Sequence, residues 1–357
     1  MKTYLKKLAL AAVLGGLGSA TLQAQVTHIV FVGGNATSKL IQDRWSTLFG
    51  GALTTNPTNT SLIFRYTGST VPGVVGTVTA DFNLTGGAGA VLDLKNGTPV
   101  TLQDNTKAPP TAVVSAVAPE TIGVDSSVFT SLESVVVPIV FIKNNNPKND
   151  LAGVTNLTQR NAALLESAAG QLTTEYFAGG PVTSRTPTNT LYFVGRNNIA
   201  AVRQLVDANI YYSGTVNNYT TNASGLPIKY LSGGQPWGAG SGGEVVAIVN
   251  SITNAIGTVS AQDVNGTVTT LAYEGVPFST ANVANGSYPI WGVEQYLYWP
   301  SGLLAATPDQ VTIINALEGG VSDVTYGHTS SLFVNKFVEI GDLQVSRTGD
   351  GGPITPN

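Results

Sequence analysis

The stretch Leu191–Thr215 contains the pattern that most limits how this chain can fold. A short apolar run of strand-forming residues ends at Gly195, and from Ile199 the apolar residues return every three or four positions, as in an amphipathic helix. This order predicts a strand, a tight turn and a helix, with Arg196 in the turn. The N–H groups of a helix N-terminus and a nearby guanidinium together favour an anion. The alternative is that Arg196 only caps a neighbouring carbonyl or faces solvent.

The N-terminal part of the chain repeats this order. Thr27–Val32 is a strong strand pattern, followed by Gly33–Asn35 and a helix with its apolar residues on one face. Ser61–Tyr66 is a second strand pattern, and Thr67–Thr70 is the turn before another expected helix. Such turns meet at the carboxyl edge of open α/β sheets, where these sheets bind ligands. The alternation therefore predicts an α/β fold with mixed sheets flanked by helices.

The first 25 residues have the features of a secretory signal peptide. Lysines precede a short apolar core at Leu8–Leu17, and small residues follow near Ala20 and Ala24. The apolar core is shorter than the roughly 20 residues of a membrane span, and no later segment reaches that length. We therefore expect a periplasmic or secreted protein without membrane insertion. The chain has no cysteine, which excludes disulfides, thiolate metal sites and a lipid anchor.

Length and local patterns predict two domains. About 330 residues follow the signal peptide, more than a single hydrophobic core usually serves. Val135–Ile142 and Tyr288–Trp299 have the pattern of two crossings between domains, and Pro138 argues for a crossover or edge strand and against a sheet centre. Turn residues between Asp81 and Pro110 predict a β-hairpin insertion. The resulting division is 1–25 for the signal peptide, 26–134 plus 288–357 for domain 1, and 135–287 for domain 2.

Composition and motif spacing argue against several classes of function. Charged residues make up 11% of the chain and its net charge is -4, so it offers no basic field for nucleic acid and no polybasic patch for membranes. The sequence has two histidines, His28 and His328, and no G-x-S-x-G nucleophile elbow. No cluster of carboxylates accompanies the histidines to make a metal site. Gly238–Gly243 matches G-x-G-x-x-G, but the preceding strand is weak and the acid that should follow, Asp263, stands in a different context. We expect no enzyme activity, no cofactor and no metal.

The order of these segments resembles the phosphate-binding protein family of phosphate ABC transporters, which has a two-domain type 2 periplasmic solute-binding fold. The likeness extends over most of the chain and rests on the order of the motifs. The segments are the first loop and helix (Gly33–Trp45), the second phosphate loop (Tyr66–Val74), an apolar strand and its end (Pro109–Pro119), the arginine loop (Val194–Gln204), a glycine-rich helix start and small strand (Gly240–Val264) and the return crossing (Tyr288–Tyr298). The resemblance implies two α/β domains that close over a small ligand by hinge motion.

The resemblance also implies a site for a small anion such as phosphate between the domains. The implied ligand-binding residues are Thr37, Ser69, Thr70, Ser115, Arg196, Asn198 and Ser241. Two features of the family are missing. Ala116 replaces an aspartate that accepts a hydrogen bond from protonated phosphate, and Ala200–Val202 replaces Ser-Gly-Thr. Each lost hydrogen bond to a charged ligand is worth about 1.5–3 kcal/mol, which weakens phosphate binding by several orders of magnitude.

Two hypotheses of different classes follow. In the first, the chain is an exported, monomeric solute-binding protein that delivers a small ligand to an ABC transporter permease. In the second, it is a secreted structural or surface-interaction protein that uses the same fold without a small ligand. The low charge and the abundance of Gly, Thr and Asn suit the second hypothesis.

Overall fold

The computed structural model describes residues 25–147, 149–230 and 237–357. Of the predicted signal peptide only Gln25 is described. Residues 231–236, which precede the predicted glycine-rich helix start, also lie outside the described residues. The strands of the main sheet are β1 (Val26–Gly33), β2 (Ala52–Thr55), β3 (Ile63–Ser69), β4 (Thr77–Asn83), β7 (Ala112–Ser115), β8 (Thr130–Asn144), β10 (Tyr192–Val194), β13 (Ala255–Ser260), β14 (Val268–Thr270), β16 (Trp291–Tyr298) and β17 (Val338–Glu339). The α-helices are α2 (Ser38–Leu48), α3 (Gly87–Asn96), α4 (Gln159–Ala168), α5 (Thr174–Phe177), α6 (Ala201–Asn209), α7 (Gly242–Ser251), α8 (Thr280–Ala284), α9 (Pro308–Val321) and α10 (Val324–Thr329).

Short elements complete the chain. The separate two-stranded pairs are β5 (Val100–Thr101) with β6 (Lys107–Ala108), β9 (Asn156–Leu157) with β15 (Ala272–Tyr273), β11 (Tyr219–Thr221) with β12 (Pro227–Lys229), and β18 (Val345–Arg347) with β19 (Ile354–Pro356). The 3-10 helices are η1 (Asn35–Thr37), η2 (Pro119–Ile122), η3 (Ser126–Val128), η4 (Asn149–Gly153), η5 (Ala261–Asp263) and η6 (Ile340–Asp342). None of the described helices is both long and apolar enough to cross a membrane.

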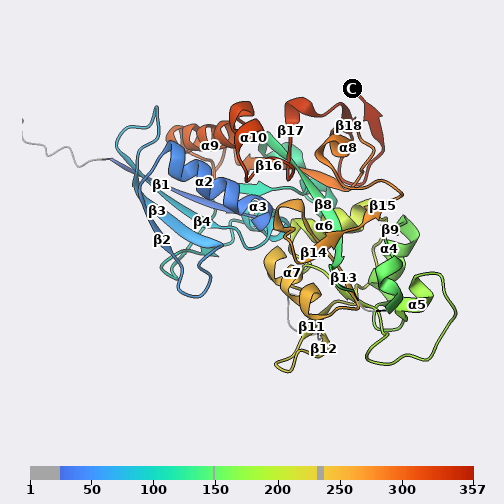
Figure 1. The fold of residues 1–357 in the computed structure, drawn as a ribbon. Coiled ribbons are helices and arrows are strands. Elements are labelled where there is room, and N and C mark those ends of the chain that lie inside the picture. The colour runs from blue at the N-terminus through green and yellow to red at the C-terminus, as the bar shows by residue number, and fades with distance from the viewer. Residues whose placement is uncertain (1–24, 148, 231–236) are drawn as a thin grey trace, which may run out of the picture.

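One mixed sheet of eleven strands organises the molecule. Its order is β10-β13-β8-β16-β7-β1-β4-β3-β2, and β14 and β17 both pair with β8. Strand β1 is parallel to β4 and β7, and β10 is parallel to β13, whereas β16 is antiparallel to both β7 and β8. The sheet with its flanking helices confirms the predicted fold class (Figure 1).

The sheet has two halves joined by two long strands. We call β7, β1, β4, β3 and β2 with α2, α3 and α9 the first lobe, and β10 and β13 with α6 and α7 the second lobe. Strands β8 and β16 lie side by side between them (Figure 1). The predicted crossings fall on these two strands, and the predicted domain boundaries within 26–357 remain a prediction.

Strand β1 shows why this sequence forms the centre of the first lobe. Its alternate residues Ile29 and Phe31 are buried on the same side as Trp45 of α2, whereas Val30 and Val32 are buried with the apolar face of α3. A strand that is buried on both faces needs a nearly continuous apolar run, which is the pattern of this segment. Strand β1 is therefore fixed by helices on both sides, and its carboxyl end is held in place.

Strand β8 lies inside the sheet, so the edge strand drawn as one alternative from Pro138 is wrong, whereas the crossover alternative agrees with its course between the lobes. Residues up to Pro138 pair with β16, whereas the pairs with β13 begin at Ile139. Proline has no N–H to donate to a ladder. Because the neighbouring strand changes at this residue, the missing donor is tolerated in an interior strand that passes from one lobe to the other.

The segment between residues 61 and 110 also differs from the prediction. The strand expected at Ser61–Tyr66 is present as β3, but the chain forms turns and then β4 where a helix was expected. Between Asp81 and Pro110 lie the end of β4, helix α3 and only a small hairpin, β5–β6. Helix α3 begins Gly-Ala-Gly, a sequence with low helix propensity. Its packing against β1 and β7 overrides that local preference.

A buried lysine holds the end of β8 to the following turn. Lys143 is 5% exposed, and its Nζ donates hydrogen bonds to the carbonyls of Leu151 (2.9 Å), Ala152 (3.0 Å) and Val154 (2.7 Å). Burial lowers the pKa of Lys143. The Leu151 carbonyl also accepts from the Val154 N–H (3.2 Å), so the carbonyls of Ala152 and Val154 are the ones that depend on this ammonium group.

We predict that Lys143→Met destabilises the fold, because it leaves the carbonyl of the buried Val154 without a donor. The free energy of unfolding should fall by about 1–3 kcal/mol in urea denaturation. Lys107→Met, at an exposed lysine, is the control and should change it by less than about 0.5 kcal/mol. Equal unfolding midpoints for both variants and the wild type would contradict this account.

Candidate functional site

A small cavity lies where several loops of the two lobes meet. Its lining residues follow the carboxyl ends of β1, β4 and β10: Gly34, Asn35, Ala36, Gly86, Gly87, Arg196, Ala200, Ala201 and Val202. Its volume is about 10 Å³, which is room for about one water molecule. The loops therefore meet at the sheet edge that was expected to bind a ligand, and they are packed together there.

Helix N-termini converge on this cavity without side-chain caps. In the described part of the chain, six of the nine α-helices begin with a Ser, Thr or Asp side chain that accepts a backbone N–H. The three that lack such a cap are α2, α3 and α6. The starts of α3 and α6 line the cavity, whereas α2 is separated from it by η1, which also begins without a side-chain cap and supplies Asn35 and Ala36 to the lining. The first N–H groups of a helix lack acceptors within it and carry its positive dipole end, so the cavity is an electrostatically favourable place for an anion.

Arg196 is the charged group at the cavity. It is 1% exposed, and its guanidinium donates to Asn35 Oδ1 (2.6 Å), to the Ala239 carbonyl (3.1 Å) and to the Gly240 carbonyl (2.9 Å). Asn35 belongs to the first lobe, so this bond joins the two lobes. Arg196 caps carbonyls, as one alternative from the sequence expected, and it does not face solvent. Binding of an anion by Arg196 stays a prediction.

Two acidic residues near Arg196 affect its pKa. Burial lowers the pKa of Arg196 to about 10, and the nearby Asp263 and Glu244 oppose that shift. The guanidinium is therefore protonated at neutral pH. Burial likewise raises the pKa of Asp263, against the effects of Arg196, Lys39 and Lys336.

The N-terminus of α3 receives a backbone carbonyl from the second lobe. Ile199 O accepts hydrogen bonds from the N–H groups of Ala88 (3.0 Å) and Gly89 (3.2 Å). Gly86 permits this approach, because a Cβ there would lie 3.0 Å from both the Ile199 carbonyl oxygen and its Cγ1. The oxygen of Ile199 therefore stands where an anion at this helix end would place one of its own oxygens.

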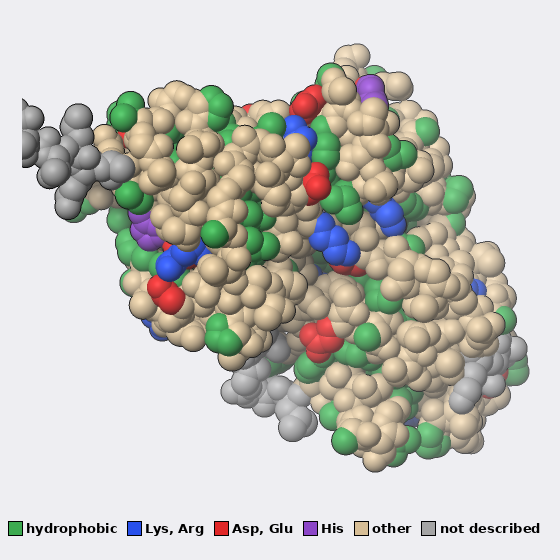
Figure 2. Space-filling view, turned by 60° about the vertical axis from the view of Figure 1, so that its left-hand side comes forward, with side chains coloured by type: hydrophobic (Ala, Val, Ile, Leu, Met, Phe, Trp, Pro, Cys, Tyr) green, Lys and Arg blue, Asp and Glu red, His purple; other side chains and the backbone are tan. Residues whose placement is uncertain are grey.

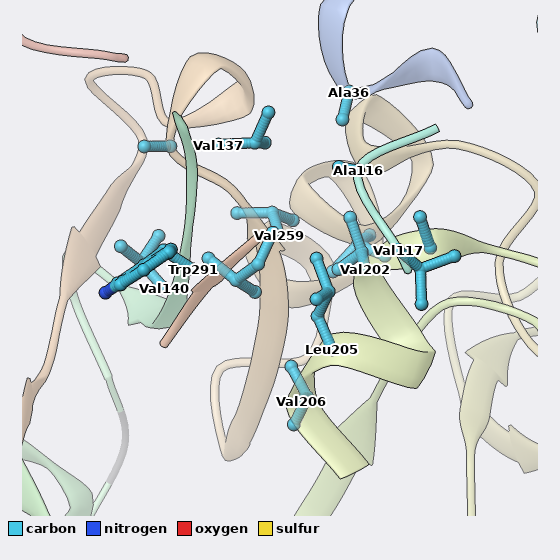
Figure 3. Close-up of a cluster of buried hydrophobic side chains, with 14 of the residues drawn as sticks. Ala36, Ala116, Val117, Val137, Val140, Val202, Leu205, Val206, Val259 and Trp291 are labelled. Carbon is cyan, nitrogen blue, oxygen red and sulfur yellow. The ribbon is translucent and has the colours of Figure 1, made fainter. Parts of the chain in front are cut away.

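Apolar side chains surround the closed cavity. Figure 3 shows Ala36 and Ala116 above Val202 of α6, with Val117 beside Val202 and Leu205 below it. Ala116 and Val202 are 3% and 2% exposed. Both stand where the resemblance implied polar ligand groups, and both are part of the hydrophobic core instead.

Two of the predicted site residues lie near the cavity with their hydroxyls engaged elsewhere. Thr37 is buried in η1, and its Oγ1 donates to the Glu294 carboxylate of β16. Ser115 lies at the end of β7, where its Oγ would be 3.0 Å from a Cβ at Gly87. The same oxygen accepts from the Val117 N–H (3.2 Å) and donates to the Val117 carbonyl. Neither hydroxyl lines the cavity.

The predicted second loop, with Ser69 and Thr70, lies elsewhere. Strand β3 is antiparallel to β4, so its carboxyl end is at the opposite edge of the sheet from the ends of β1 and β4. Ser69 accepts from Trp45 Nε1 (3.1 Å) and donates to the Gly50 carbonyl (2.8 Å), and Thr70 is exposed. The loop that reaches the cavity is the one after β4, which contains Gly86 and Gly87.

The remaining predicted residues flank the cavity. Asn198 is exposed, and its carbonyl accepts from the Gln204 side chain. Ser241 caps α7 by accepting the Glu244 N–H (3.1 Å). Its neighbour Gly240 supplies one of the carbonyls that Arg196 contacts. Of the seven predicted residues, Arg196 alone lines the cavity.

Comparison with known proteins places the fold in a class. No protein-family model and no curated protein matches the chain. Its fold is similar to that of a putative phosphate ABC transporter substrate-binding protein from Clostridium perfringens, solved with bound phosphate. The TM-score is 0.54 at 14% identity, and the match covers 87% of this chain and 99% of that one. The chain thus has the fold of the phosphate ABC transporter substrate-binding proteins, at a distance in sequence.

Two further solved structures show lower similarity. An ABC-type phosphate transport receptor from Vibrio cholerae has a TM-score of 0.47 at 14% identity and covers 81% of this chain and 93% of its own. The Synechocystis CcmR regulatory domain in complex with 2-PG has a TM-score of 0.44 at 10% identity and covers 84% of this chain and 99% of its own.

Glu294, the partner of Thr37, gives a pH-dependent prediction. Burial raises its pKa to about 8, and the hydrogen bond from Thr37 partly opposes the shift. Between the ordinary value of 4.5 and about 8, the folded protein keeps a proton that the unfolded chain releases. This contribution to stability is fully present below about pH 4.5 and is lost as the pH rises to about 8.

We therefore predict that Glu294→Gln removes this part of the pH dependence. Relative to the variant, the wild type should lose on the order of a few kcal/mol of unfolding free energy between pH 5 and pH 8. Urea denaturation at both values measures the difference, and Glu120→Gln at an exposed site is the control. If the wild type and Glu294→Gln show parallel pH profiles, Glu294 does not hold the proton.

Proposed function

We propose that this protein is an exported solute-binding protein that holds a small oxyanion between its lobes and delivers it to a membrane transporter. The observation that carries the proposal is the convergence of the starts of η1, α3 and α6, all without side-chain caps, on a cavity lined by the buried Arg196. Apart from α2, which directly follows η1, side chains cap the other described α-helices, so the missing caps coincide with the place where a ligand would supply them. The fold shared with the phosphate-binding protein from Clostridium perfringens supports the same assignment.

The anion enters by separating the lobes. The cavity of about 10 Å³ has no room for a tetrahedral oxyanion. Opening breaks the bonds from the α3 N–H groups to Ile199 O and from Arg196 to Asn35, and it uncovers the N–H groups at the starts of η1, α3 and α6. An anion then replaces neutral acceptors with charged ones, and such hydrogen bonds are roughly twice as strong.

The chemistry of the cavity favours a fully ionised anion. Its donors are backbone N–H groups and one guanidinium, and Ala116 offers no acceptor for an acidic P–OH group. Asn35 Oδ1 is a neutral acceptor at the cavity, and without a carboxylate to repel a fully ionised anion the site distinguishes little between phosphate and sulfate. Phosphate and sulfate are therefore both expected ligands.

A second candidate function is a secreted structural or surface-interaction protein. The hydrogen bonds from the α3 N–H groups to Ile199 O and the apolar cluster around Val202 favour it, because both hold the lobes together without any ligand. Figure 2 shows a face made largely of uncharged groups, with scattered charges of both signs. An inability to bind any small anion distinguishes this function from the first.

We predict that the protein binds phosphate and sulfate with affinities within about tenfold of each other. Isothermal titration with each anion measures both. Arg196→Lys keeps the charge but loses the forked geometry and should weaken binding by at least about tenfold, whereas Arg160→Ala, at an exposed arginine of α4, should not. Absence of binding by the wild type at millimolar concentrations would contradict the proposal.

A variant that should gain phosphate affinity is a second test of the cavity as an anion site. Val202→Thr keeps the side-chain shape and places a hydroxyl at the start of α6. A hydrogen bond to a charged ligand is worth about 1.5–3 kcal/mol, so phosphate affinity should rise by about tenfold or more. Without an anion the buried hydroxyl should lower stability. Val206→Thr, one turn along α6, is the control and should not raise affinity.

A further inference from the structure

A second group of polar side chains lies away from the cavity, in the C-terminal part of the chain. His328 is in the last turn of α10, Glu339 is in β17 and Asp342 is in η6. His328 Nε2 is 3.5 Å from Glu339 Oε1 and 3.6 Å from Asp342 Oδ2, and one ligand atom from each residue lies within 4.8 Å of the others. Ligand atoms that bind one metal ion at about 2.0–2.2 Å have spacings of this size.

The buried carboxylate of Glu339 is an independent sign of a missing partner. The residue is 4% exposed, and in the described part of the chain no hydrogen bond reaches its Oε1. An unpaired buried carboxylate oxygen is costly. Only a glycine at position 327 allows this oxygen its place, because a Cβ there would lie 2.0 Å from Oε1. Oε1 is also the atom of Glu339 that lies 3.5 Å from His328 Nε2.

The surrounding charge favours a cation. Asp323, which caps α10, and Asp342 are acidic groups close to Glu339, and His328 is the basic group beside it. Arg44 is paired with Asp323 at 3.4 Å. Three carboxylates thus face one arginine and one histidine. A groove of about 560 Å³ beside the group is lined by His328, Glu339 and Asp342 and also by Gln344, so water has access to the point between the three ligand atoms.

We propose that His328, Glu339 and Asp342 bind one divalent transition-metal ion, for which Zn²⁺ is the best match. One imidazole nitrogen and two carboxylate oxygens form a ligand set that Zn²⁺ accepts, and water completes the coordination from the groove. The bound ion joins α10 to β17 and η6. Because β17 pairs with β8, the metal fastens the C-terminal part of the chain to the strand that runs between the lobes.

The test uses the full chain after removal of metals with EDTA. Titration with ZnCl₂ should show one ion per chain, and Zn²⁺ should raise Tm. His328→Ala and Asp342→Asn change side chains that are 66% and 56% exposed, so the fold should be kept. Each should weaken zinc binding by at least about tenfold, a loss that even outer-shell partners can cause. His28→Ala, at the only other histidine, is the matched control and should bind zinc as the wild type does.

Three results would overturn the proposal. The first is no zinc binding by the wild type, and the second is equal binding by His328→Ala and Asp342→Asn. The third is a loss of Tm in His328→Ala that is the same in EDTA as in zinc, which would make the group an ion-pair cluster only. Phosphate titration of the same variants should be unchanged, which separates this site from the cavity between the lobes.

Discussion

The burial of Arg196 between the lobes is the constraint on which the rest of the structure depends. A buried guanidinium is tolerated only when acceptors surround it, and here they come from Asn35, Ala239 and Gly240. One acceptor follows β1 and the other two precede α7, so three distant segments must meet around one side chain. The position of the loops at the sheet edge follows from that requirement.

The closed cavity and the proposed anion site are two arrangements of the same groups. In the closed arrangement Ile199 O accepts the N–H groups of α3, and apolar residues such as Ala116 and Val202 complete the contact. An oxyanion would use the same N–H groups and the same guanidinium. The ligand must therefore exchange with the protein's own carbonyl oxygens, and its affinity is set by the difference between the two sets of hydrogen bonds.

Much of the fold could be predicted because local pattern and final structure agree. The segment Leu191–Thr215 forms β10, the Arg196 turn and α6, and Arg196 is buried at the cavity. The second loop was misplaced because β3 has a strong strand pattern but is antiparallel, a relation that no local pattern reveals. Gly86 and Gly87 were interpreted as hairpin turns, although a strand-like run precedes them and an apolar run follows. Asn35, Ile199 and Glu294 could not be assigned roles, because their partners are distant in sequence.

The central claim is that the helix N-termini and Arg196 form an anion site which the protein's own groups occupy when no anion is present. The most direct measurement is a pair of crystal structures, one without anion and one at saturating phosphate. The account predicts phosphate within hydrogen-bond distance of the Arg196 guanidinium and of N–H groups at the starts of α3 and α6, with Ile199 O displaced from Ala88 and Gly89. An unchanged cavity at saturating phosphate, with Ile199 O still bonded to α3, would contradict it.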